Sequence, residues 1–362
     1  MRLVHLTDIH LSKSNHHEFE HKYKDALIKD LLNYHSEKPI DLILITGDLV
    51  DKGGHSLFEI EGYEDYKCPY DIFEEVFIDP ISEGTGINKN SFLFVPGNHD
   101  VNEKEISYYD ECRLTDDIDS INIETYLHDN KSTYKTNKRI KQFKDFERKF
   151  HENNDLYNCT NNHSIYVHKL GENIKVGFLL INDSWRCKTR KFSGEDGKIF
   201  FGFHQLDYCL KELESYDTEL NICLFHHPIS DYKEETEVER IIRNKNIELY
   251  LYGHYHSQDF EVKHSSNGSC FGIRGRAALN KPEEKESEYQ SGYQIIDIDI
   301  LSYSISKIHY RKYIYKNSRF DYDAESAMGG VESNFGGDGF KLHRINKKSI
   351  GFDLDKDKFW KE

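Results

Sequence analysis

The chain has 362 residues and a formal net charge of −16 at pH 7, with 31% of its residues charged. This length allows one large domain with insertions or two domains of common size, and the negative charge disfavours broad binding to nucleic acid by counter-ion release. No apolar run approaches the ~20 residues that span a bilayer, so no membrane segment is expected. The seven cysteines are scattered without a CxxC motif, which favours a reducing, cytoplasmic location over a disulfide framework or a thiolate zinc site.

The N-terminal part of the chain alternates short apolar strands with a helix. Residues 2–7, RLVHLT, follow a β pattern from the start of the chain, so MRLVHLTDIH is expected to begin the fold rather than to be a signal peptide. Apolar residues at intervals of three and four predict a helix over 18–37. The runs at 41–46 and 92–95 are continuously apolar, as in strands covered on both faces.

The later part repeats this alternation and then becomes mainly β. The runs 164–170 and 175–182 flank a Gly-Glu-Asn turn and are typical of a hairpin. Further elements are predicted in chain order: a helix at 203–215, strands at 221–225 and 249–252, and consecutive strands over 259–310.

Two long insertions and a tail interrupt this pattern. Residues 53–90 separate the second predicted strand from the third, and residues 101–163 form a charged, mostly helical excursion. This excursion contains a basic segment at 131–149, for which a solvated surface is one interpretation and a groove for nucleic acid is another. We therefore expect a domain over residues 1–317 with insertions at about 53–90 and 101–163, and a flexible C-terminal extension over 318–362.

Side chains that bind metals or move protons follow the ends of five predicted strands. Sites in α/β sheets form at the carboxyl ends of strands, and residues two apart on an extended chain point to the same side. One such pattern is common by chance, but five of them at strand ends favour a single shared site. The candidates are Asp8, His10, Asp48, Asn98, His99, Asp100, His226, His227, His254 and His256.

These residues make the chain similar to the calcineurin-like metallophosphoesterases over residues 1 to about 310. That family is marked by the motifs D-x-H, G-D-x-x-D, G-N-H-D/E, a later histidine and G-H-x-H. The resemblance implies an α/β fold, a four-layer α-β-β-α sandwich. In it, two mixed sheets pack face to face between flanking helices, with a dinuclear metal site at the strand C-terminal ends. The matching stretches are Asp8-Ile9-His10, Gly47-Asp48-Leu49-Val50-Asp51, Gly97-Asn98-His99-Asp100, His226 and Gly253-His254-Tyr255-His256.

The resemblance also implies a role for each motif residue. Asp48 would bridge two divalent ions, because cations ~3.5–4 Å apart repel one another without an anion between them. A set of oxygen and imidazole donors without thiolate suits manganese, iron, zinc or nickel. The implied ligands are Asp8, His10 and His256 for the first ion and Asn98, His226 and His254 for the second, with His226 favoured over His227.

Four more residues carry predictions about catalysis or support. His99 is expected to contact the phosphate and to protonate the leaving group, while Asp100 orients and charges its imidazole. Asp51 is expected to hold its own loop through hydrogen bonds to backbone. Arg276, in FGIRGRA, joins Asn98 and His99 as a candidate substrate-binding residue, since arginine suits a phosphate; a surface ion pair is the alternative.

Within the family, HLTDIHL, GNHD and HHP most resemble the bacterial cyclic-nucleotide phosphodiesterases. The resemblance implies hydrolysis of a phosphodiester, in a cyclic nucleotide or another small nucleotide-type substrate, by a hydroxide that two metal ions activate. Three alternatives stay open. One is a nuclease like the double-strand-break repair nuclease of the superfamily, acting on DNA or RNA. Another is a Ser/Thr protein phosphatase, which Lys52 in place of arginine disfavours. The last is a non-catalytic component of a complex, which binds a protein partner through an insertion or the tail.

Overall fold

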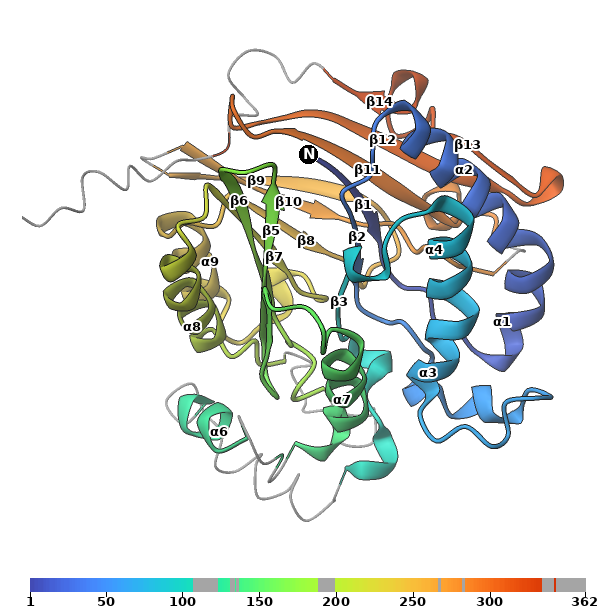
Figure 1. The fold of residues 1–362 in the computed structure, drawn as a ribbon, viewed down its shortest axis with the longest axis horizontal. Helices are drawn as coiled ribbons and strands as arrows, with labels where there is room; N and C mark the ends of the chain where they lie inside the picture. Colours follow the sequence, from blue (N-terminus) through green and yellow to red (C-terminus); the bar gives the residue numbers. More distant parts are fainter. Residues whose placement is uncertain are drawn as a thin grey trace, which may run out of the picture.

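The apolar runs of the sequence form two β-sheets in the computed structural model (Figure 1). The structure describes residues 1–106, 123–130, 134, 137–187, 199–265, 268–281, 284–333 and 342. The first sheet contains β1 (Arg2–Leu6), β2 (Leu42–Thr46), β3 (Phe92–Val95), β11 (Gly292–Asp299), β12 (Ser304–Ile314), β13 (Arg319–Tyr322) and β14 (Val331–Glu332). Its order is β13-β12-β11-β1-β2-β3, with β14 paired to β12.

The second sheet has both parallel and antiparallel pairs, like the first. Its strands are β4 (Tyr157–Cys159), β5 (Ser164–Leu170), β6 (Ile174–Leu180), β7 (Leu220–Leu224), β8 (Leu249–Tyr252), β9 (Asp259–Ser265) and β10 (Gly268–Arg274). The order is β4-β5-β6-β7-β8-β10-β9. The predicted hairpin is the antiparallel pair β5–β6, and β6, β7 and β8 are parallel. These parallel strands end at the same edge.

The sheets pack face to face, because alternate residues of each strand point to opposite faces. In β1, Leu3 lies in the core between the two sheets, whereas Val4 lies in the core between the first sheet and its outer helices. Ile222 and Leu249 of the second sheet belong to the same central core as Leu3. The predicted α-β-β-α sandwich is confirmed.

Helices cover the outer face of each sheet (Figure 1). Leu27 of α2 and Ile81 of α4 pack on the first sheet, and Leu206 of α8 and Val238 of α9 pack on the second. Among the described residues, no helix is both long and apolar enough to cross a membrane. The described helices are α1 (Lys13–Glu18), α2 (Lys24–Glu37), α3 (Pro69–Phe73), α4 (Asp79–Thr85), α6 (Ile123–Asn130), α7 (Lys141–Phe150), α8 (His204–Leu213) and α9 (Glu235–Asn244).

Both predicted insertions contribute to these layers. Residues 53–90 supply α3 and α4, whose apolar side chains belong to the core outside the first sheet. In the second insertion, Phe146 of α7 stacks on Phe94 of β3, with ring centroids 5.3 Å apart. Through α7, the second insertion is therefore packed on the core outside the first sheet.

The predicted boundary at residue 317 is wrong, because the first sheet continues beyond it. β13 and β14 both pair with β12, and Asp323 forms a buried ion pair with Arg276 at 2.8 Å. Residues 318–332 are thus part of the sandwich. Of the remaining tail, residues 334–341 and 343–362 lie outside the described residues.

Candidate metal centre

The predicted ligand residues meet at one edge of the sandwich. β1, β2 and β3 are parallel neighbours in the first sheet, and β7 and β8 are parallel neighbours in the second. Each predicted ligand lies in the loop after one of these strands, so the five loops converge. Among the described residues, four groups of three side chains could each hold a metal ion, because the ligand atoms within each group lie within 4.8 Å of one another. The groups are Asp8, His10 and His256; Asp8, Asp48 and His226; His10, Asp48 and His99; and His226, His227 and His254.

Left-handed backbone turns the chain sharply at these strand ends. The φ angles are 52° at Asp8, 49° at His10, 54° at Asp48, 75° at His254 and 59° at His256. Residues with a Cβ rarely adopt such angles, and strain of this kind clusters at functional sites. The strained backbone therefore holds these side chains in positions that a relaxed strand end would not give them.

The glycines of the motifs allow the loops to approach closely. A Cβ at Gly97 would overlap Oδ1 of Asp48, and one at Gly253 would overlap Oγ1 of Thr7. A side chain at Gly97 would push the loop of Asn98 away from Asp48, and one at Gly253 would push the loop of His254 away from Thr7 and Asp8. Glycine is thus required before Asn98 and before His254 because there is no room for a Cβ atom at either position.

The first group of ligand atoms, from Asp8, His10 and His256, contains a buried oxygen to which no described residue donates a hydrogen bond. Asp8 is fully buried, and its Oδ1 has no hydrogen-bond partner among the described residues. This atom lies 3.3 Å from Nε2 of His256 and 3.7 Å from Nε2 of His10. The two imidazole nitrogens are themselves 3.2 Å apart. An oxygen and two nitrogens that converge in this way fit a divalent cation.

The second group is built around Asn98. Its Oδ1 lies 3.1 Å from Nε2 of His226 and 3.1 Å from Nδ1 of His254. Nδ1 of His226 donates to the carbonyl oxygen of Thr46 at 2.8 Å, which fixes the tautomer and leaves Nε2 as the ligand atom. Oδ2 of Asp48 is 3.3 Å from that Nε2 and 3.6 Å from Nε2 of His10. Asp48 therefore stands between the two groups.

The local charges keep the two carboxylates ionised and His254 neutral, whereas, despite burial, Asp48 raises the pKa of His226 to about 9 and Asp8 raises the pKa of His256. Burial alone would raise the pKa of Asp8, but the nearby imidazoles of His256 and His226 hold it below its usual value. Burial opposes ionisation of Asp48 as well, and His226 and His10 together bring its pKa well below the usual range. Burial and the neighbouring imidazoles lower the pKa of His254 to about 3. Metal binding requires ionised carboxylates and neutral imidazole.

His99 differs from most of the ligand histidines because the carboxylate nearest to it, that of Asp51, lies outside the proposed ligand set. Its Nδ1 lies 2.7 Å from Oδ1 of Asp51, and 34% of its side chain is exposed. Burial lowers the pKa of His99, but Asp51 and then Asp48 outweigh it, so the pKa is raised. The ring meets that of His10 edge to face at 4.5 Å. His99 is thus a partly exposed imidazole with a raised pKa beside the ligand cluster.

The prediction that Asp100 orients His99 is wrong. The carboxylate of Asp100 is buried and accepts hydrogen bonds from the backbone N–H groups of Gly97 at 2.8 Å and of Leu49 and Val50 at 3.2 Å each. It therefore ties two motif loops together. The expected roles are exchanged: Asp51, predicted to bond to backbone, is the residue that holds the imidazole.

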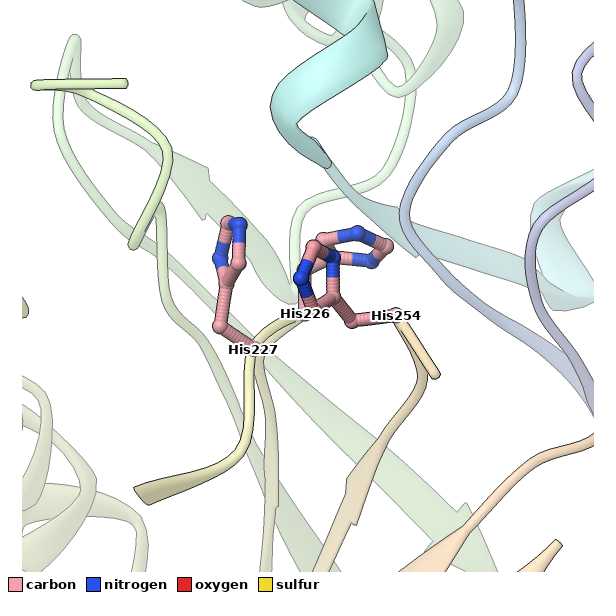
Figure 2. Close-up of side chains that lie close together, drawn as sticks. All are labelled: His226, His227 and His254. Carbon is pink, nitrogen blue, oxygen red and sulfur yellow. The ribbon is translucent and has the colours of Figure 1, made fainter. Parts of the chain in front are cut away.

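Three imidazoles gather where β7 and β8 end (Figure 2). Nδ1 of His227 pairs with Oδ2 of Asp183 at 2.9 Å, and the hydroxyl of Tyr232 donates to the same oxygen at 2.6 Å. Of the two histidines, His226 and not His227 faces Asp48 and Asn98, as a ligand role for His226 requires.

The model of the calcineurin-like phosphoesterase family matches residues 1–258. The chain belongs to this family. It is also similar to the uncharacterized metallophosphoesterase-like protein YydB of Bacillus subtilis (strain 168), with 22% identity over 353 residues. The alignment covers 95% of this chain and 66% of that protein, so the chain spans just under two thirds of the relative's length.

Several solved structures are similar in outline to this calcineurin-like phosphoesterase. A dimetal phosphatase from Danio rerio has 9% identity and a TM-score of 0.43, with 86% of this chain and 95% of that chain covered. The NAD nucleotidase of Haemophilus influenzae has 12% identity and a TM-score of 0.47, with 93% and 54% covered. These scores are low, so the family assignment rests on the match to the family model.

Arg276 does not join the phosphoesterase site. Its side chain is 2% exposed and its guanidinium pairs with Asp323 at 2.8 Å. The expectation that Arg276 binds the phosphate is therefore wrong. The alternative, a surface ion pair, is correct in that Arg276 forms an ion pair, but that pair is buried. The partner of Arg276 is thus the carboxylate of Asp323, which directly follows β13, and not a phosphate of the substrate.

The sequence analysis did not identify Asp231, which lies beside the second ligand group. Its Oδ2 is 3.9 Å from Nε2 of His254, and its Oδ1 accepts a hydrogen bond of 2.9 Å from the hydroxyl of Tyr255. Carboxylates commonly orient the imidazoles that bind metals. No motif spacing identifies Asp231, because it reaches His254 from a different loop.

Proposed function

We propose that the chain is a two-metal phosphodiesterase that hydrolyses a small nucleotide-type phosphodiester in the cytoplasm. The position of Asp48 carries this proposal, because its Oδ2 faces an imidazole of each ligand group, His226 at 3.3 Å and His10 at 3.6 Å. Manganese, iron, zinc or nickel suits these donors. The proposed ligands are Asp8, His10, Asp48 and His256 for one ion and Asp48, Asn98, His226 and His254 for the other.

The residues around the ligands suggest how the chain would act on a phosphodiester. When bound, two divalent ions supply an activated water and offset the charge on the phosphoryl oxygens. His99 is exposed and carries a raised pKa, so it is suited to give a proton to the leaving oxygen. Asp51 holds its Nδ1, which leaves Nε2 to face the substrate. Asn98 supports the phosphate from the same turn.

A small substrate is favoured over a long polyanion. The net charge is −16, and several cations in the described part of the basic segment 131–149 are already paired. Lys144 forms a buried ion pair with Glu147, and Lys149 lies 3.0 Å from Asp71. These cations contribute little net positive charge to a groove for DNA or RNA.

The protein phosphatase alternative has little support at the site. Lys52 occupies the position after Asp51 where that branch carries arginine. Its Nζ is 3.9 Å from Oδ2 of Asp51, and its side chain is largely exposed. Lysine is a point charge and cannot hold a phosphate through two parallel hydrogen bonds as arginine does.

Metal analysis combined with a substrate panel tests the proposal. The purified chain is loaded with Mn²⁺ and given cyclic nucleotides, bis-aryl phosphate, an aryl monophosphate, an oligonucleotide and a phosphopeptide. We expect two metal ions per chain and turnover of the small diesters that changes little with salt. Turnover of the oligonucleotide alone, with a steep decline as salt rises, would favour the nuclease. Silence toward every substrate by a fully loaded chain would contradict any catalytic function.

A further inference from the structure

An aromatic side chain lies exposed beside the second ligand group and has no role in metal binding. Tyr255 sits between His254 and His256 in the sequence, and 45% of its surface is exposed. Its ring centroid is 5.3 Å from that of His254, whose Nδ1 faces Asn98. One imidazole thus separates the exposed ring from the ligand atoms.

Two neighbours hold this ring in place. The hydroxyl of Tyr255 donates to Oδ1 of Asp231 at 2.9 Å, and the guanidinium carbon of Arg274 lies over the ring at 5.4 Å from the centroid. Arg274 is itself fixed, because its Nε donates to the carbonyl oxygen of Ser257 at 2.7 Å and its Nη2 pairs with Asp259 at 3.2 Å. The ring is therefore ordered before any ligand arrives.

An ordered, exposed aromatic ring is suited to stack on another flat ring. Arg274 lies over one face of the Tyr255 ring, and 45% of the residue is still exposed. Stacking of a base on an aromatic side chain tolerates any base, because each has a π-face. A ring that is already fixed loses little conformational entropy on binding.

We propose that Tyr255 determines specificity by stacking on the base of a nucleotide whose phosphate lies at the metal centre. This inference rests on the proposed function and names the part of the substrate that the chain would recognise beyond the phosphate. In a nucleotide the base is one sugar ring from the phosphorus, and Tyr255 is one imidazole from the ligand atoms. A phosphoester that carries a flat ring is thus favoured over one that carries only an alkyl group or a sugar.

Calorimetric titration of the Mn²⁺-loaded full chain with adenosine 5′-monophosphate and with ribose 5-phosphate tests this, because the two probes differ only in the base. The wild type is expected to bind adenosine 5′-monophosphate about 10-fold more tightly, within the range that base stacking contributes. Tyr255→Leu should reduce this ratio of Kd values to about one. Manganese content is measured in each variant, so that a loss of metal is recognised.

Two matched variants separate the ring from its hydroxyl and from general exposure. Tyr255→Phe keeps the π-face and loses only the hydrogen bond to Asp231, so most of the preference for the base should remain. Tyr322→Leu removes a somewhat more exposed tyrosine from edge strand β13, and its ratio should match the wild type.

The inference is overturned if the wild type binds the two probes equally. It is also overturned if Tyr255→Leu keeps the wild-type ratio, or weakens both probes by the same factor. Because the ratio is an equilibrium quantity, it decides the role of Tyr255 even if no phosphoester is hydrolysed. Absence of turnover would instead contradict the proposed function.

Discussion

The metal-ligand cluster and a second buried cluster around Asp30 differ in how their carboxylates are satisfied. Asp30 of α2 accepts from Nε and Nη2 of Arg311 at 2.8 and 2.6 Å, and from the hydroxyl of Tyr293 at 2.6 Å. Every acceptor there faces a donor. At the metal centre, Oδ1 of Asp8 has no hydrogen-bond partner among the described residues, and Asp48 faces two imidazole nitrogens.

This difference separates a cluster that stabilises the fold from one that binds a ligand. A buried acceptor without a donor costs about 1–3 kcal/mol, and more when it is charged. A folded chain tolerates that cost where a cation completes the set, and left-handed backbone at Asp8, His10 and Asp48 adds to it. The Asp30 cluster needs nothing further. Substitutions in the two clusters should therefore have opposite effects on turnover and stability.

The largest effect on turnover is expected from Asp48→Asn. Loss of the carboxylate that faces both groups should lower kcat by more than the roughly 100-fold that removal of an outer-shell partner can cost. Mn²⁺ should raise Tm in the wild type and not in the variant. Metal analysis and thermal unfolding with and without chelator measure this. A variant that binds both ions and still turns over would remove Asp48 from the centre.

His99→Asn should reduce kcat by about 10²–10⁴-fold, the usual contribution of a proton donor, while two ions remain bound. The reason is that His99 pairs with Asp51 and leaves the ligand atoms to other residues. Asp51→Asn is the control. Its amide oxygen can still accept a hydrogen bond from Nδ1 of His99 but carries no charge, so kcat should fall less than in His99→Asn. Loss of metal from the His99 variant would show that His99 belongs to the ligand set.

At the satisfied cluster, Arg311→Met should lower the free energy of unfolding by about 3–5 kcal/mol, because it leaves Asp30 buried without its ion-pair partner. The turnover per folded molecule should stay at the wild-type value, since Arg311 is on β12, away from the ligand loops. Urea unfolding gives the first quantity and initial rates the second. Asp30→Leu combined with Arg311→Met should recover part of the stability, because no unpaired charge remains. If the double variant is less stable than the single one, the ion pair is not what Asp30 contributes.

Much of the sandwich could be predicted from the sequence because its strands are short and continuously apolar. The run at 92–95 coincides with β3, and the first strand of the predicted hairpin, 164–170, coincides with β5. The helix predicted over 18–37 is preceded by α1 and interrupted by a π-helical turn at Phe19–Tyr23, which a pattern of apolar residues does not distinguish. The end of the domain was misplaced because β13 and β14 are short and partly exposed.

The ligand set follows from sequence for a physical reason, whereas its supporting residues do not. Ligands lie directly after strands, so the order of strands places them together. Asp51 and Asp100 are equally near the turn that holds His99, and only the loop geometry shows that Asp51 reaches the imidazole. Asp231 and Arg276 depend on contacts between loops that are far apart in the sequence.

The smallest effect is expected where a charged pair is exposed rather than buried. Lys149 of α7 and Asp71 of α3 lie 3.0 Å apart across the two insertions, with 66% of the lysine side chain exposed. Exposed pairs contribute about 0–1 kcal/mol because water screens them, so Lys149→Ala should change stability by less than ~1 kcal/mol. Lys22→Ala is the control, because it removes another surface ion pair, with Glu18 in the N-terminal helical segment. Both variants should hydrolyse small diesters as the wild type does. If Lys149→Ala alone weakened binding to an oligonucleotide and reduced the salt slope by about one, Lys149 would be a phosphate contact and the nuclease would become the better function.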